Sequence, residues 1–221
     1  MADFHQTGVI STLHRLGPPS LRRLERELLT YSDERPGALV LPGLYTELRG
    51  PALKGIVEAL EGVPYLRQVV VSLSGAAARE QYEEMQALFA RVPTLVGRPP
   101  TVLWNQGPRI TALLERLREE GLEPGEDGKG RATWLAYGYV LATHTARVVA
   151  VHDCDILDYR AELLARLVYP TANPNLGYEF AKGYYGRVTD QLHGRATRLF
   201  MTPFLRAMKS GSAARSRGSA R

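Results

Sequence analysis

The stretch "VVAVHDCDI", residues 148–156, decides the fold because it joins a run of apolar residues directly to two aspartates. Four consecutive apolar residues, 148–151, are typical of a strand that is covered on both faces of a parallel sheet. Carboxylates are costly to bury without a partner, so Asp153 and Asp155 should mark the place where the chain leaves the core. The stretch therefore predicts a buried strand that ends at a polar site.

Three similar apolar runs precede this one, and helical periods separate them. The runs are "GALVL" ending at Leu41, "QVVVSL" ending at Leu73 and "TVLW" ending at Trp104, and the fourth run ends at His152. Strands that alternate with amphipathic helices predict an α/β fold, with an open, mostly parallel sheet in a three-layer α/β/α sandwich. Ligands of such sheets bind beyond the carboxyl ends of the strands, so the loops after these runs are the candidate site.

The composition fits a folded domain with a basic tail. A chain of 221 residues with 44% hydrophobic residues can bury a full core, and we expect one domain over residues 1–207. Residues 208–221 read as a low-complexity tail without an apolar period. The net charge is +5, but this tail contains four basic residues and no acidic ones, so the rest of the chain is nearly neutral. A nucleic-acid partner is therefore not expected.

The cysteine count and the apolar runs restrict the class of protein further. A single cysteine excludes an internal disulfide, which agrees with a reducing compartment. No run of apolar residues approaches the roughly 18 that a membrane-spanning helix needs. We expect a cytoplasmic protein that binds no membrane.

Three interpretations of the aspartate pair are open from the residues alone. In an extended segment Asp153 and Asp155 point to the same side, and Cys154 points to the other. The pair could form a solvated turn, provide the nucleophile and the acid/base of a metal-dependent phosphohydrolase, or hold a hard divalent cation against a nucleotide diphosphate.

A second motif favours the nucleotide interpretation. The loop "GEDGKG", residues 125–130, places Lys129 at the start of an apolar helix that leads into the aspartate strand. No Ser or Thr follows Lys129, so the loop is not a Walker A motif. A lysine at a helix N-terminus is nevertheless a suitable phosphate partner, although a solvated loop with an incidental charge remains the alternative.

Several ordered motifs resemble one family of enzymes. The segments "VLPGLYTEL", "VLWNQGPRI", "GKGRATWLAYGYVLA", "HDCDI" and "YYGRVTDQLHGRATRLFMTPFLRA" are similar to those of glucosyl-3-phosphoglycerate and mannosyl-3-phosphoglycerate synthases. This resemblance implies the GT-A glycosyltransferase fold, which is Rossmann-like, and a retaining, metal-dependent enzyme. It implies transfer of a hexose, with glucose expected in preference to mannose, from a nucleotide diphosphate sugar to D-3-phosphoglycerate. The product would be a precursor of a compatible solute.

The resemblance also implies roles for individual residues. Asp153 and Asp155 match the pair that holds Mg²⁺, or Mn²⁺ in its place, and Asp155 and Arg187 would be the catalytic residues. Many relatives have a glutamate where this chain has Thr46, so the contact of that glutamate with the nucleoside is either lost here or made by Glu47 instead. The donor-binding residues would be Pro42, Gly43, Leu44, Glu47, Lys129 and Asp153, and the acceptor-binding residues would be Gly186, Arg187 and Thr189.

The resemblance carries two further expectations. It implies a homodimer. It also implies a longer acceptor-side region after Met208, with a histidine that completes the metal shell. The alternative function is therefore a fragment that binds the nucleotide sugar with little or no turnover.

Overall fold

The computed structural model describes residues 20–183, together with Phe204 and Ala207. The helices and strands described below all belong to one unit, residues 15–182; a second unit comprises residues 1–14 and 183–221. The predicted boundary at residue 207 and the basic tail fall in this second unit. In chain order the elements are α1 (Leu21–Tyr31), β1 (Gly37–Leu44), the 3-10 helix η1 (Tyr45–Arg49), α2 (Pro51–Glu61), β2 (Leu66–Ser74), α3 (Arg79–Phe89), β3 (Thr101–Trp104), α4 (Pro108–Glu119), α5 (Lys129–Thr143), β4 (Val148–Val151) and α6 (Ala161–Ala172).

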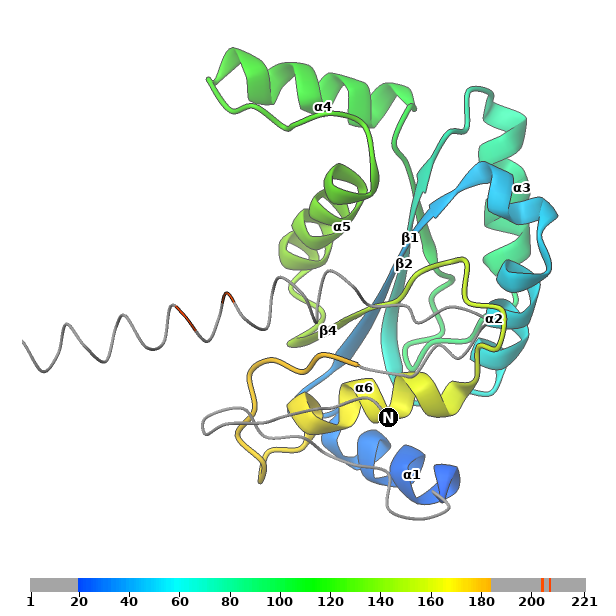
Figure 1. Ribbon diagram of the computed structural model, residues 1–221, viewed down its shortest axis with the longest axis vertical. Helices are drawn as coiled ribbons and strands as arrows, with labels where there is room; N and C mark the ends of the chain where they lie inside the picture. The colour runs from blue at the N-terminus through cyan, green and yellow to red at the C-terminus, as the bar shows by residue number, and fades with distance from the viewer. Residues whose placement is uncertain (1–19, 184–203, 205–206, 208–221) are drawn as a thin grey trace, which may run out of the picture. The chain divides into compact units, whose positions relative to one another are not determined.

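The four predicted strands form one parallel sheet in the order β3-β2-β1-β4 (Figure 1). β3 ends at Trp104 as predicted, whereas the other three strands end at other residues than predicted. β1 continues past Leu41 to Leu44, because the segment 42–44 pairs with residues 72–74 of β2. β4 stops at Val151, and His152 only adds one backbone hydrogen bond to Val40 of β1.

Alternate residues of β1 belong to different apolar layers. Leu39 and Leu41 face a large core that includes buried side chains of α1, α2, α3 and α6. Ala38 and Val40 face a smaller core that α5 closes. Helices therefore cover both faces, as Figure 1 shows with α5 on one side of the sheet and α2 and α3 on the other. The predicted three-layer α/β/α arrangement is confirmed.

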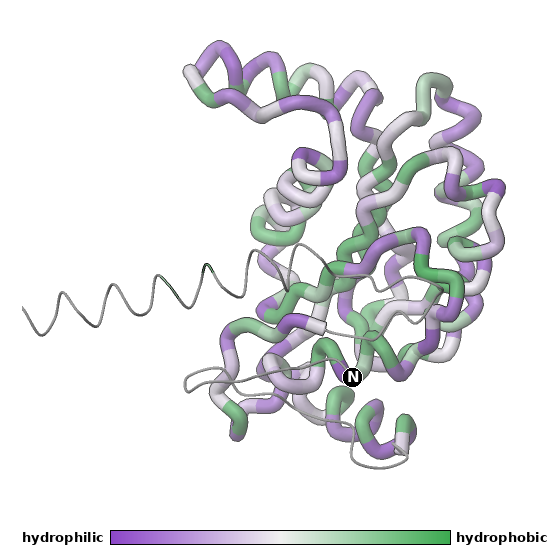
Figure 2. The backbone as a smooth tube through the Cα atoms, in the orientation of Figure 1, coloured by the Kyte–Doolittle hydropathy of each residue, from purple (hydrophilic) through white to green (hydrophobic). Residues whose placement is uncertain are grey.

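The helices α4 and α5 differ in polarity. α4 is mostly hydrophilic in Figure 2, and Leu114 is its one buried residue. α5 is apolar on both of its sides: Leu135, Ala136 and Val140 are among its buried residues, whereas Trp134 and Leu141 are 50% and 71% exposed. In the part of the chain that the structure describes, no helix is long and apolar enough to cross a lipid bilayer.

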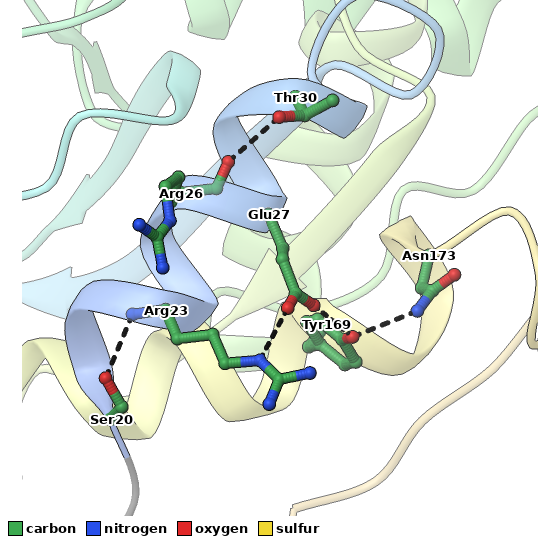
Figure 3. Close-up of polar contacts among 7 residues, drawn as sticks. All are labelled: Ser20, Arg23, Arg26, Glu27, Thr30, Tyr169 and Asn173. Carbon is green, nitrogen blue, oxygen red and sulfur yellow. Dashed lines mark hydrogen bonds and ion pairs between the residues drawn. The ribbon is translucent and has the colours of Figure 1, made fainter.

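α1 is fastened to α6 by a polar cluster (Figure 3). The Glu27 carboxylate accepts hydrogen bonds from the Tyr169 hydroxyl at 2.5 Å and from Nε of Arg23 at 2.7 Å, and Asn173 donates to the Tyr169 oxygen at 3.1 Å. The bond to Glu27 raises the pKa of Tyr169 to about 12. Ser20 caps α1 by accepting a hydrogen bond from the Arg23 backbone at 3.3 Å.

Candidate functional site

Three segments that lie far apart in the sequence meet beyond the carboxyl ends of β1 and β4. Lys129, the first residue of α5, places Nζ 2.5 Å from Oδ1 of Asp153, which follows β4. Glu47, in η1, is close enough to Lys129, Asp153 and Asp155 for each of these charges to shift its pKa. The structure thus brings together the lysine loop, the aspartate pair and the loop after β1, all of which the sequence had singled out.

Glu47 is the carboxylate that links η1 to this cluster. Its Oε2 accepts a hydrogen bond from the backbone N–H of Leu44 at 2.7 Å. Burial raises the pKa of Glu47, and Asp155 and Asp153 raise it further, while the Leu44 N–H and Lys129 act in the opposite direction. The net upward shift of the Glu47 pKa thus has burial as its main cause, with smaller opposing effects of the aspartates and Lys129. Thr46 is exposed, so Glu47 is the residue of this pair that lies beside the aspartates.

The Asp-Cys-Asp segment is a turn, and the extended geometry expected for it is wrong. Because β4 ends at Val151, Cys154 and Asp155 already lie in a turn of the following loop. The alternation of exposure is nevertheless present: the Asp153 side chain is 39% exposed, Asp155 is exposed, and Cys154 is 2% exposed. Both carboxylates therefore reach solvent while the residue between them is in the core.

Gly43 lies directly against Cys154. A Cβ atom built on Gly43 would be 2.8 Å from Cys154 Sγ, closer than Cβ atoms approach other atoms in proteins, and 3.1 Å from Glu47 Oε2, which is a tight contact. Pro42 and Gly43 are buried at the end of β1, and Leu44 is half exposed. The absence of a side chain at Gly43 thus lets the loop after β1 approach the aspartate turn.

His152 and Tyr159 hold the two ends of the aspartate turn together. His152 Nδ1 lies 2.8 Å from the Tyr159 hydroxyl, and the rings meet edge to face with their centroids 5.2 Å apart. Burial lowers the pKa of His152 to about 4, although Asp153 acts against this shift, so the imidazole is neutral at pH 7. Sequence reasoning assigned no role to either residue, because a histidine and a tyrosine seven residues apart form no recognised motif.

A buried polar cluster occupies the corresponding ends of β2 and β3. Asn105 Nδ2 donates to Ser72 Oγ at 3.0 Å and to Ser74 Oγ at 2.9 Å, and all three side chains are buried. Trp104 beside them donates to the Ala76 carbonyl at 2.6 Å. From the sequence, a site is expected in the loops after these strands, but these residues are not singled out. The two serines interrupting an apolar strand were the available signal.

The loop that carries Lys129 is fixed to the loop after β3. Asp127 accepts a hydrogen bond from Gln106 Nε2 at 2.8 Å and forms an ion pair with Arg131 at 2.8 Å. Arg131 also donates to the Gly125 carbonyl at 3.1 Å. These contacts hold the residues on both sides of Lys129 and thereby fix the start of α5.

The two aspartates suit a hard divalent cation that shares its shell with a ligand. Within residues 20–183, Phe204 and Ala207, no group of three or more His, Cys, Asp or Glu side chains could hold a metal ion. Mg²⁺ commonly takes one or two protein carboxylates and completes its shell with phosphate oxygens and water. Asp153 and Asp155, whose side chains both reach solvent, could provide that number of hard oxygen ligands.

The predicted acceptor residues Gly186, Arg187 and Thr189 lie outside the described residues. Their assignment to 3-phosphoglycerate stays a prediction. So do the roles of the donor and metal residues, whose positions are described above.

Comparison with known proteins finds two relatives that carry the same name. No model of a protein family matches it. It is 44% identical to the glucosyl-3-phosphoglycerate synthase of Persephonella marina over 208 residues. This aligned segment is 94% of this chain and 50% of that protein. It is 35% identical over 214 residues to the glucosyl-3-phosphoglycerate synthase of Methanococcoides burtonii, covering 95% of this chain and 51% of that one. The resemblance seen in the motifs is thus confirmed, and the chain is a homologue of glucosyl-3-phosphoglycerate synthases along nearly all of its length, spanning about half of theirs.

Proposed function

We propose that this chain forms the nucleotide-sugar site of a retaining hexosyltransferase that makes glucosyl-3-phosphoglycerate. The observation that carries the proposal is the meeting of Lys129, Asp153, Asp155 and Glu47 beyond the ends of β1 and β4. A parallel sheet of this kind binds its ligands at that edge. The name shared by both relatives supports the reaction.

The leaving group of the reaction is a nucleoside diphosphate, and the cluster is suited to its charge. Asp153 and Asp155 would hold Mg²⁺ or Mn²⁺, which supplies neutralisation of the charge that develops on the diphosphate. Lys129 would donate a charge-assisted hydrogen bond to a phosphate oxygen from a fixed position at the start of α5. The backbone at Pro42 and Gly43 lies in the core beside this cluster and would line the nucleoside site.

The acceptor is an anion with a phosphate and a carboxylate. Arg187, with Gly186 and Thr189, would bind it, because a guanidinium donates paired hydrogen bonds to such groups. Transfer with retention requires the acceptor hydroxyl to attack from the face that the diphosphate leaves, so the contribution of Arg187 would be one of positioning.

A second function, binding of the nucleotide sugar without transfer, uses the same donor cluster. The observation behind it is that Lys129, Asp153 and Asp155 are groups suited to the donor alone. A homodimer and a cytoplasmic location stay predictions from the resemblance.

The experiment that separates these functions is an activity panel on the chain as it stands. UDP-, GDP- and ADP-glucose and the matching mannose donors are incubated with D-3-phosphoglycerate and Mg²⁺. Nucleotide release is followed together with product mass and, by NMR, with the anomeric configuration, and binding of each donor is measured by calorimetry with and without Mg²⁺. Formation of an α-linked product from an α-linked donor supports the transferase, and Mg²⁺-dependent binding without product supports the donor-binding function. Absence of both binding and product contradicts the proposal.

A further inference from the structure

The ion pair between Lys129 and Asp153 occupies one of the two carboxylate oxygens that Asp153 could offer to a divalent cation. Lys129 Nζ is 2.5 Å from Asp153 Oδ1, and carboxylate oxygens bind Mg²⁺ or Ca²⁺ at about 2.0 to 2.6 Å. An ammonium group and a cation cannot both approach the same oxygen from the same side at these distances. Either Lys129 or the cation can use this part of Asp153, but not both.

Lys129 also has several carboxylates around it. Besides Asp153, it acts on Glu47, whose pKa it lowers against the larger effect of burial. Lys129 also lowers the pKa of the Cys154 thiol. The three carboxylates nearby raise that pKa: Glu47, Asp153 and Asp155. The lysine is therefore the counter-ion of a group of acids, a place that a divalent cation would otherwise take.

The pair is also accessible enough to exchange partners. The Lys129 side chain is 59% exposed and that of Asp153 is 39% exposed, so breaking their contact does not leave an unsolvated charge. Lys129 is the first residue of α5, where its long side chain extends from a fixed backbone and can turn from Asp153 toward a neighbouring phosphate. A diphosphate bound at this helix start would offer such a partner.

We propose that Lys129 and the divalent cation compete for Asp153, and that a bound diphosphate relieves this competition by drawing Lys129 away. This inference rests on the proposed function, since it takes the ligand to be a nucleoside diphosphate. Its consequence is coupling: the cation binds weakly to the protein alone and more tightly with the nucleotide, and Lys129 is the residue that links the two events.

The test measures cation affinity without turnover. Mn²⁺ binding is followed by the loss of the free-ion EPR signal, with and without UDP, for the unaltered chain and for Lys129→Gln and Lys129→Arg. Partly exposed ion pairs of this kind are worth little, so we expect Lys129→Gln to bind Mn²⁺ alone about two- to fivefold more tightly. Lys129→Arg keeps the charge and should behave like the unaltered chain. UDP should increase Mn²⁺ affinity less in Lys129→Gln than in the unaltered chain.

Lys54→Gln provides the matched control, because it removes the same charge from an exposed position on α2. An equal gain in Mn²⁺ affinity in Lys54→Gln and Lys129→Gln would show a general charge effect and overturn the inference. Unchanged Mn²⁺ affinity in Lys129→Gln would also overturn it while leaving the donor site intact. Failure of every variant to bind Mn²⁺, even with UDP, would remove the metal role in the proposed function and the inference with it.

Discussion

Replacing Gly43 with alanine should destabilise the protein, and the cause should be traceable to one neighbour. The new methyl group would meet Cys154 Sγ at 2.8 Å, Glu47 Oε2 at 3.1 Å and Cys154 Cβ at 3.3 Å. Overpacking of this kind typically costs about 1 to 3 kcal/mol. The φ angle of Gly43 is not positive, so alanine can adopt its backbone conformation and restricts the unfolded chain, which offsets about 0.4 to 1 kcal/mol. The midpoints of the two ranges leave a net expected loss of about 1.3 kcal/mol.

Two further variants assign this loss to the contact. Gly43→Ala combined with Cys154→Ala removes the sulfur that the methyl group meets first, so the double variant should lose less than the sum of the two single losses. The coupling should be at least about 0.5 kcal/mol. Gly55→Ala is the control of opposite sign: a Cβ there has nothing within 4 Å, and alanine inside α2 should stabilise by up to about 1 kcal/mol.

The assay is urea unfolding followed by circular dichroism, with calorimetric titration of UDP and Mg²⁺ on the same samples. Because the displaced atoms belong to Cys154 and Glu47, Gly43→Ala should weaken nucleotide binding as well as stability. A Gly43→Ala protein as stable as the unaltered chain would refute the close contact. Strict additivity of Gly43→Ala and Cys154→Ala would show that the loss arises elsewhere.

The other predictions concern the metal, the acceptor and the cluster between α1 and α6. Asp155→Asn should weaken Mg²⁺-dependent nucleotide binding at least about tenfold in calorimetry, whereas Asp158→Asn, at an exposed position three residues on, should not. Arg187→Ala should weaken 3-phosphoglycerate binding about ten- to a hundredfold and spare the donor, and an equal loss of both would indicate misfolding. Tyr169→Phe should lower stability at pH 7 by about 1 kcal/mol or less, because it removes a hydrogen bond to Glu27. The hydrogen bond from Arg23 has the largest effect in lowering the pKa of Glu27, and the bond from Tyr169 has the next largest. A carboxylate whose pKa is lowered by folding stabilises the protein at pH values above its unfolded-state pKa. This stabilisation is lost as the pH falls through its lower folded-state pKa, so the melting temperatures of Tyr169→Phe and the unaltered chain should converge below about pH 4.

Much of the fold follows from local sequence. Three strands can be located from the apolar runs that end at Leu41, Leu73 and Trp104, because each run is long enough for a strand and is followed by polar, glycine or proline residues. Val148–Val151 locates the fourth strand. Parallel pairing then places the following loops at one edge, which is why Lys129 and the aspartates could be expected near one another before any distance was known.

The details that shape the site could not be obtained in this way. β1 extends through Pro42 to Leu44 because β2 provides partners for it, and a proline ordinarily argues against a strand interior. The Asp-Cys-Asp turn depends on the contact of Cys154 with Gly43 and on the pairing of His152 with Tyr159. Such contacts join side chains without any periodic spacing, so hydrophobic patterns do not reveal them.

The measurement that tests the central claim most directly is calorimetric titration of UDP-glucose, GDP-glucose and ADP-glucose into the chain, with Mg²⁺ and with EDTA. The claim is that Lys129, Asp153 and Asp155 form a metal-assisted diphosphate site. It predicts that one of these donors binds with Mg²⁺ and loses at least about tenfold in affinity with EDTA, and that Asp153→Asn binds as weakly as the EDTA sample. Equal affinity with Mg²⁺ and EDTA, or full Mg²⁺-dependent binding by Asp153→Asn, would contradict it.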